Sequence, residues 1–177
     1  AAAEPSGAES PSPYQFLKEE NPDFWGWLSI PETKVDYPVM YSPEEPERYL
    51  RRAFDGSSSP SGVPFVGEGY REDGRHTIIY GHNMKNGTMF APLLSYADKH
   101  FWEEHPVITF ATLKGEHTYQ VLGAFYSQAY QSAEENIFRY YQCCDLSTQE
   151  AFDDYIENVR AAALYDTGVT AAPGGRL

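Results

Sequence analysis

The sequence has few cysteines, few basic residues and no long apolar run. Its two cysteines, Cys143 and Cys144, are neighbours, so they provide no framework of disulfide bonds. Only 13 basic residues stand against 26 acidic ones, and the formal charge of -13 argues against a nucleic acid or an anionic lipid surface as the main partner. No apolar run approaches the roughly 20 residues that a membrane-spanning helix needs. A peptide or a protein is therefore the favoured partner.

The sequence also lacks the common motifs for cofactors and metals. It contains no phosphate-binding loop, no dinucleotide-binding glycine pattern and no His-Glu-x-x-His motif. The five histidines are His76, His82, His100, His105 and His117. His100 and His105 are five residues apart, so they do not share one face of a helix. We therefore expect no metal and no cofactor, and a metal-dependent hydrolase built on His82, His100 and His105 is the least favoured function.

Aromatic residues are what the sequence has in abundance. They make up 15% of the chain and include 14 tyrosines, within a hydrophobic content of 41%, which is typical of a globular protein rich in strands. A length of 177 residues suits one domain with a sizeable core. Residues 1–13, composed largely of Ala, Ser, Pro, Gly and Glu, resemble a flexible spacer that follows a removed membrane anchor. We expect one folded domain over 14–177.

Short strands alternate with helices along this domain. Aromatic and β-branched runs predict strands at 24–30, 35–40, 63–66, 77–80, 107–112 and 117–126. Helices are predicted at 13–20 and 46–54, after Thr88 over 89–97, and after the capping boxes that begin at Ser132 and Ser147. The pattern predicts an α+β fold, mainly β, in which a barrel or sheet carries inserted helices.

His82 lies just beyond the strand predicted at 77–80, directly after Gly81. A histidine at the end of a strand is more often a structural residue than a catalyst. The surrounding sequence favours chemistry here, because several separated segments resemble one family in order and spacing. They are YGHNM at 80–84 with GTMF at 87–90, NPDFWGWLSIP at 21–31, DYPV at 36–39 and RYL at 48–50. On these segments the chain resembles the class B sortases over about 14–177.

The resemblance implies a fold, a place and a reaction. The fold is a closed sortase-type β-barrel with an N-terminal helix and inserted helices, which would be incomplete if the chain ended at Leu177. The place is the surface of a Gram-positive bacterium, with an N-terminal anchor in the membrane. In that family a cysteine thiolate attacks the carbonyl of a sorting motif in a secreted protein. An amine of peptidoglycan or of a pilin then resolves the acyl-enzyme.

The resemblance also assigns roles to three residues. His82 matches the catalytic histidine, whose protonated imidazole would favour the thiolate and then give its proton to the leaving amine. Leu50 and Tyr141 would contact the substrate in the binding groove. These two assignments rest on approximate position, and packing in the core is an equal alternative for each.

The nucleophile and the arginine of the family find no match. The family's nucleophile ends a late strand that reads Thr-Leu-x-Thr-Cys, its arginine follows on the next strand, and neither segment is present. The similar residues 146–148 are followed by Gln149, and we interpret them as a helix start. Cys143 and Cys144 fall in a region that resembles the family's helical insertion, so we expect a structural or incidental role for both. Three arginines also match no position of the family's arginine: Arg139, Arg160 and Arg176.

Two interpretations of the missing segment follow. Either the sequence is part of a sortase whose nucleophile strand lies after Leu177, or it is a sortase-like module that binds peptides without catalysis. We favour the first, because a barrel without its last strands leaves backbone groups unpaired and one side of the core open. The chain alone is then expected to be inactive in transpeptidation.

Overall fold

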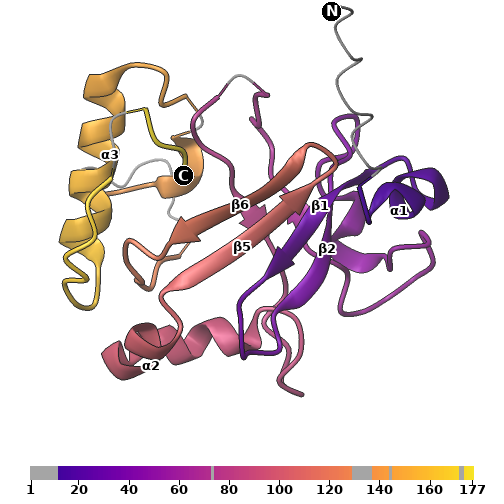
Figure 1. Cartoon of the computed structure of the whole chain (residues 1–177), viewed down its shortest axis with the longest axis horizontal. Helices are drawn as coiled ribbons and strands as arrows, with labels where there is room; N and C mark the ends of the chain where they lie inside the picture. The colour runs from indigo at the N-terminus through magenta and orange to yellow at the C-terminus, as the bar shows by residue number, and fades with distance from the viewer. Residues whose placement is uncertain (1–11, 73, 129–136, 144, 172–173) are drawn as a thin grey trace, which may run out of the picture.

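The strands of the computed structural model form one sheet. The structure describes residues 12–72, 74–128, 137–143, 145–171 and 174–177. The strands are β1 (Phe24–Ser29), β2 (Asp36–Met40), β3 (Phe65–Val66), β4 (Ile79–Tyr80), β5 (Val107–Thr112) and β6 (Gly115–Gln120). Their order is β4-β3-β2-β1-β5-β6, in which β2 and β3 are parallel and the other neighbours antiparallel. Within the described residues the sheet is a curled, open half-barrel with β4 and β6 at its edges (Figure 1).

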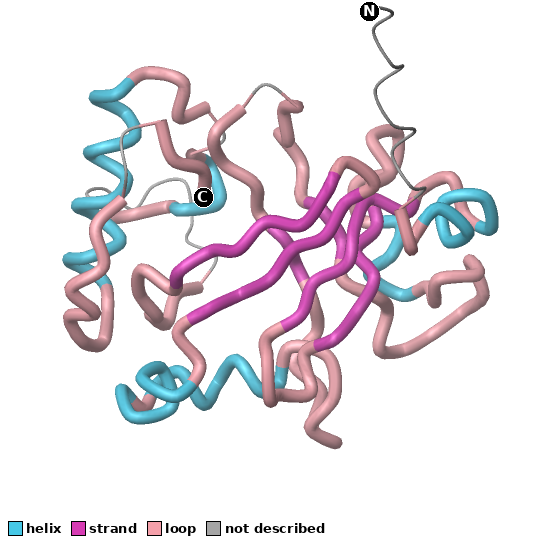
Figure 2. The backbone as a smooth tube through the Cα atoms, in the orientation of Figure 1, coloured by secondary structure: helices cyan, strands magenta, loops and turns pink. Residues whose placement is uncertain are grey.

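Short helices lie around this sheet. They are α1 (Gln15–Glu20), α2 (Lys99–Glu104), α3 (Gln149–Ala162) and the 3-10 helices η1 (Arg48–Arg51), η2 (Ala91–Ala97) and η3 (Tyr140–Gln142). The helices α1 and α3 lie on opposite sides of the sheet (Figure 2). Among the helices that the structure describes, none has both the length and the apolar character to cross a membrane.

The two faces of the sheet carry separate apolar clusters. Neighbouring residues along a strand point to opposite faces, and accordingly Val39 belongs to one cluster and Met40 to the other. We name the faces after these two residues. The Val39 face buries Leu28, Ile30, Val35, Val39, Val66, Tyr96 and Phe110, and the Met40 face buries Phe24, Met40, Tyr49, Val63 and Phe65. Residues of η2 and α2 cover the Val39 face, and residues of α1 and η1 cover the Met40 face.

A β-bulge interrupts the alternation of faces along the central strand β1. The pairing advances from Phe24 to Gly26 on β1 while it moves only from Met40 to Val39 on β2, so β1 carries one extra residue at this point. Phe24 and Trp27 are an odd number of residues apart, and yet both pack on the Met40 face because of the extra residue. The alternation of the sequence alone does not predict this arrangement.

Strands β1 and β5 approach each other closely at Gly26. A Cβ atom added to this buried glycine would lie 2.3 Å from the ring of Phe110 and 2.7 Å from the carbonyl oxygen of Ala111. Any other residue here would force the two central strands apart. Gly26 is therefore required by packing.

The predicted mainly β fold with inserted helices is confirmed, and several boundaries differ. The strands predicted at 63–66 and 77–80 shorten to β3 and β4, and the strand predicted at 117–126 ends at Gln120. The helix predicted at 46–54 is the short η1, because the chain after it folds back into a turn in which Arg52 pairs with Ser58. The helix predicted after Ser132 begins outside the described residues.

Two predicted helix caps also differ from the observed ones. Thr88 does not cap the helix predicted at 89–97, because its hydroxyl donates to the side chain of Asn86 at 2.6 Å and η2 begins at Ala91. The helix predicted after residue 147 is α3, and its cap is Thr148, whose side chain accepts a hydrogen bond from the Ala151 N–H at 3.2 Å. The interpretation of residues 146–148 as a helix start is therefore confirmed.

The contact at Gly26 leads to a prediction about stability. We expect Gly26→Ala to lower the free energy of unfolding by about 1 to 3 kcal/mol, because the added methyl group overpacks the centre of the sheet. Gly123→Ala is the matched control, since its Cβ would meet two side-chain atoms, the Cβ of Ala163 at 3.2 Å and Cγ1 of Val159 at 3.6 Å. Urea denaturation of both variants measures the difference, and equal midpoints would contradict the proposed packing constraint.

Candidate active site around His82

His82 lies two residues beyond β4, where the chain turns away from the sheet. The turn is tight, because a Cβ atom on Gly81 would lie 2.6 Å from the ring of Phe90. The carbonyl of His82 accepts a hydrogen bond from the Phe90 N–H at 2.9 Å, which closes a loop over residues 83–89. Gly87 lies in this loop with φ of 80°, a conformation that glycine adopts without strain. These contacts fix the backbone at His82.

The imidazole of His82 is half-buried and held by one hydrogen bond. Its Nε2 lies 2.8 Å from the carbonyl oxygen of Leu50. A carbonyl oxygen can only accept, so Nε2 carries the proton in this contact. The second nitrogen, Nδ1, has no hydrogen-bond partner among the residues that the structure describes. In the neutral ring Nδ1 is therefore the nitrogen without a proton.

Leu50 was predicted to contact substrate, and the structure brings it to His82. The contact is made by its backbone carbonyl, at the end of η1. The side chain of Leu50 is half-buried and packs against the cluster on the Met40 face. The prediction that Leu50 also contacts a substrate stays a prediction.

The backbone around Leu50 is tightly enclosed. The N–H of Val63 donates to the carbonyl of Tyr49 at 3.2 Å. Gly62 has φ of 58°, and a Cβ atom there would lie 2.5 Å from the carbonyl oxygens of both Tyr49 and Leu50. Residues 62–63 therefore form one wall of the position that the Leu50 carbonyl occupies.

Tyr141 lies on η3, in the part of the chain that leads to α3. Its half-buried ring stands edge-on to the ring of Tyr140, with centroids 5.4 Å apart. Its proposed place in a substrate groove stays a prediction.

Cys143 follows η3 and is half-buried. Its Sγ lies 3.6 Å from the carbonyl oxygen of Arg139, and its own carbonyl oxygen lies 2.6 Å from Nδ1 of His76. The neighbouring Cys144 lies outside the described residues. The expectation that Cys143 has a structural or incidental role stays a prediction.

His76 is a buried polar residue, with 7% of its surface exposed. Its Nδ1 donates to the carbonyl of Cys143, and its ring packs 4.7 Å from the ring of Tyr155. Burial lowers the pKa of His76 and outweighs the opposing effect of its backbone hydrogen bond. The neutral imidazole of His76 therefore joins the segment before β4 to Cys143, the residue after η3.

The remaining histidines show no convergence on His82. His100 is exposed, and its two ring nitrogens lie 3.7 Å from carboxylate oxygens of Glu103 and Glu104 on its own helix. Nδ1 of His105 lies 3.1 Å from the carbonyl oxygen of Pro31. In the described part of the chain no three side chains of His, Cys, Asp or Glu come together as they would around a metal ion.

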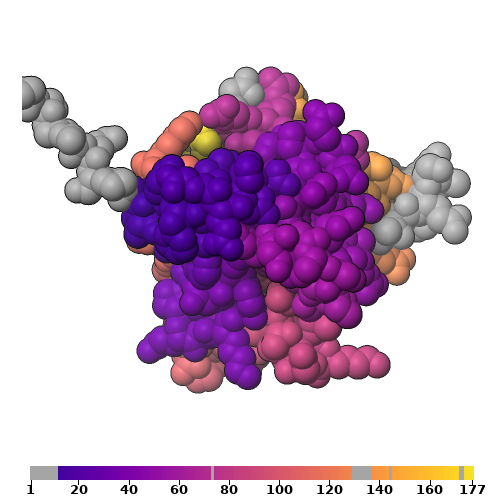
Figure 3. Space-filling view, turned by 90° about the vertical axis from the view of Figure 1, so that its right-hand side faces the viewer, coloured from indigo at the N-terminus to yellow at the C-terminus, as the bar shows by residue number. Residues whose placement is uncertain are grey.

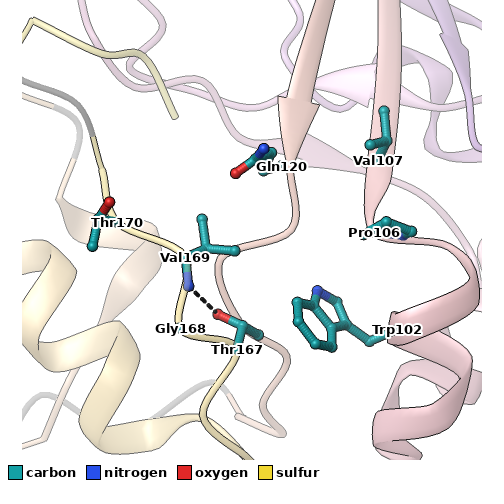
Figure 4. Close-up of a pocket in the computed structure, with 8 residues that line it drawn as sticks. All are labelled: Trp102, Pro106, Val107, Gln120, Thr167, Gly168, Val169 and Thr170. Carbon is teal, nitrogen blue, oxygen red and sulfur yellow. Dashed lines mark hydrogen bonds between the residues drawn. The ribbon is translucent and has the colours of Figure 1, made fainter.

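Two pockets lie away from this histidine. The first, of about 360 Å³, lies between α2, β5, β6 and the segment 167–170, and Trp102 and Gln120 line it (Figure 4). The second, of about 510 Å³, is lined by residues of the region after 136, including Phe138 and Cys143. Neither of these two pockets is lined by His82.

Comparison with known proteins places these observations in a family. No protein-family profile matches the chain. Sortase B of Listeria monocytogenes serovar 1/2a is 32% identical over 165 residues, which cover 91% of this chain and 63% of that protein. Sortase B of Staphylococcus aureus is 23% identical over 168 residues, which cover 93% of this chain and 64% of that protein. The chain therefore spans less than two thirds of the length of these curated relatives.

Solved structures give the same result for the fold. Sortase B from Listeria monocytogenes superposes with a TM-score of 0.75 at 29% identity, over 89% of this chain and 86% of that chain. A Staphylococcus aureus sortase B-substrate complex gives a TM-score of 0.77 at 23% identity, over 90% and 70%. Sortase B from Bacillus anthracis in complex with AAEK1 gives 0.79 at 24% identity, over 95% and 78%.

The curled β half-barrel of this chain superposes on these solved structures, so the chain has the sortase fold. The sequence of Listeria sortase B identifies the class of sortase, because its alignment at 32% identity covers 91% of this chain. The chain belongs to the class B sortases.

The burial of His76 leads to a prediction about pH. Because the pKa of His76 is lower in the folded chain than in the unfolded one, the unfolded chain binds the proton preferentially. This contribution to stability is complete above the unfolded pKa of about 6.5 and is lost as the pH falls through the folded value. We expect His76→Asn, which keeps a donor near the Cys143 carbonyl, to reduce the loss of stability between pH 7.5 and pH 5. Urea denaturation of both proteins at the two pH values tests this, and equal losses would contradict it.

Proposed function

We propose that this chain is the histidine-bearing part of a sortase transpeptidase. In the proposed reaction a cysteine thiolate attacks the carbonyl carbon of a sorting motif in a secreted protein and forms an acyl-enzyme. An amine of peptidoglycan or of a pilin then attacks the thioester and releases the enzyme. The membership of the class B sortases supports the general function. The nucleophile, the substrates and the roles of individual residues belong to the proposal.

The observation that carries the proposal is the backbone pairing of Leu177 beside the strand of His82. The N–H of Leu177 donates to the carbonyl of Arg75 at 2.7 Å, and the N–H of Thr77 donates to the carbonyl of Leu177 at 2.9 Å. Two bonds that flank one residue in this way are the pattern of parallel strands. Leu177 thus lies opposite His76 in a parallel register.

We propose that a further strand pairs with the edge of β4 beyond this pairing. The N–H of Gly67 donates to the carbonyl of Ile78 at 2.8 Å, on the side of β3. Because backbone groups alternate in direction along a strand, Ile79 and Gly81 direct theirs to the opposite edge. In the sheet order of the described strands no strand covers that edge.

The register indicates where the proposed nucleophile would come from. Polypeptide that follows Leu177 in the same parallel register would pair with Ile78, Tyr80 and His82 in turn. Leu177 lies opposite His76, so the sixth residue after it would lie opposite His82. Paired residues of parallel strands share one face at a strand spacing of about 4.8 Å. A cysteine near this position would have its sulfur within reach of the imidazole.

His82 would then act on both steps of the first half-reaction. As an imidazolium it would stabilise the neighbouring thiolate, and it would give its proton to the amine that leaves the sorting motif. Leu50 and Tyr141 are proposed to contact an extended peptide along the groove, a mode in which side chains enter successive pockets. The proposed place of action is the outer face of the cell membrane, with an N-terminal anchor.

We expect His82→Ala, in the protein extended beyond Leu177, to lower the rate of acyl transfer to an amine by at least about 100-fold. The free energy of unfolding should fall by only about 1 kcal/mol, since one hydrogen bond to Leu50 is lost. His117→Ala is the control, because His117 is exposed on β6. Transfer of a sorting-motif peptide to an amine, followed by chromatography, measures the rate. Retained turnover would remove His82 from the mechanism.

We expect the 177-residue chain alone to form no acyl-enzyme, because the proposed nucleophile is not Cys143. Incubation with a sorting-motif peptide followed by intact-mass measurement should show the unmodified chain. A thioester on Cys143 would contradict the proposal. The rival function, a peptide-binding module without catalysis, would be favoured if the extended protein bound the peptide and had no cysteine near the position opposite His82.

A further inference from the structure

The hydroxyl of Tyr49 is the centre of a buried polar network on the Met40 face. Tyr49 is 2% exposed. Its hydroxyl donates to the Asp23 carboxylate at 2.9 Å and accepts from the side-chain amide of Asn21, also at 2.9 Å. Burial raises the pKa of Tyr49, so the phenol keeps the proton that it donates. A buried tyrosine with both hydroxyl functions satisfied is held in one position.

The two partners of Tyr49 are themselves fixed. The side-chain oxygen of Asn21 accepts from the Asp23 N–H at 2.9 Å, and its amide also donates to the carbonyl of Phe54. The Asp23 carboxylate lies 3.6 Å from Nε of Arg48, the residue before Tyr49. The segment just before β1 is thus joined to two residues of η1, Arg48 and Tyr49. In Figure 3 the N-terminal surface, in indigo, lies directly against the purple surface of the following segments.

The network is linked to His82 through the residue that follows Tyr49. Tyr49 and Leu50 are consecutive residues of η1, and the Leu50 carbonyl is the acceptor for Nε2 of His82. The hydroxyl network fixes the side chain of Tyr49, and the walls at Gly62 and Val63 fix its backbone. The direction of the Leu50 carbonyl is then determined, because little rotation is left in the backbone between Tyr49 and Leu50.

We propose that Tyr49 is a positioning residue for His82. Its hydroxyl, held by Asn21 and Asp23, keeps the Leu50 carbonyl directed at the imidazole. The neutral ring is thereby held as the Nε2–H tautomer, and Nδ1 is left as the nitrogen that exchanges protons. In many hydrolases a carboxylate orients the catalytic histidine. Here a backbone carbonyl takes that place, and a tyrosine one residue away keeps the carbonyl in position.

The first experiment reads the tautomer directly and does not need activity. The 177-residue chain is labelled with ¹⁵N-histidine, and His82→Gln identifies the signals of His82. At a pH where the ring is neutral we expect the Nε2–H tautomer to predominate. Tyr49→Phe removes one hydroxyl and leaves the ring in the core, and we expect it to shift the signals of His82 toward a mixture of both tautomers.

The matched control is Tyr96→Phe. Tyr96 is 5% exposed and its hydroxyl donates to a backbone carbonyl, that of His105, at 2.7 Å, but it belongs to the cluster on the Val39 face. This variant loses one hydrogen bond of a buried hydroxyl, where Tyr49→Phe loses two, and we expect it to leave the tautomer of His82 unchanged. A general loss of stability would affect both variants alike, so a difference between them reports positioning. Unchanged signals in Tyr49→Phe, or an Nδ1–H tautomer in the unmodified chain, would overturn the proposal.

The second experiment rests on the proposed function and uses the protein extended beyond Leu177. We expect Tyr49→Phe to lower kcat for acyl transfer by about tenfold, with KM for the peptide little changed, because misplacement of the imidazole affects the reaction and not binding. An altered KM with unchanged kcat would overturn the positioning role. If the tautomer shifts as expected while the unmodified extended protein transfers no acyl group, the proposed function fails and the inference about Tyr49 stands.

Discussion

The pairing of β1 with β2 on one side and β5 on the other is the constraint on which the rest of the structure depends. Both apolar clusters include residues of β1, and the bulge near Gly26 shifts which residues of this strand face each cluster. Through β2 and β3 this central pairing determines where β4 runs. His82 lies just after β4, and Leu50 belongs to η1, which packs on the Met40 face. The sheet as a whole therefore positions the site.

The sequence predicts the strands better than the site. Aromatic and β-branched runs identify β1, β2 and β5 with small errors at their ends, because packing on a pleated surface is a local property of those side chains. The position of His82 just after a strand is also predicted correctly. The bulge is not predicted, since it depends on how Gly26 meets Phe110 from a distant part of the chain.

The partner of the imidazole could not be predicted from residue types. Leu50 was selected by resemblance as a side chain in a groove, and the group that meets His82 is its carbonyl, which every residue possesses. The network around Tyr49 was also missed. One signal was available, because a buried tyrosine needs a partner for its hydroxyl and the Asn-Pro-Asp segment at 21–23 offers both a donor and an acceptor. Joining the two required knowledge that β1 starts beside η1.

The use of a carbonyl to orient His82 has a consequence for the conditions in which the site keeps its geometry. A carboxylate in the same place would gain a proton in acid and lose much of its hold on the ring. The amide oxygen of a peptide bond does not titrate in the range where proteins stay folded, so its capacity to accept from the imidazole is the same in mildly acidic and mildly alkaline surroundings. The acceptor of this ring nitrogen is therefore the same group whatever the acidity of the medium.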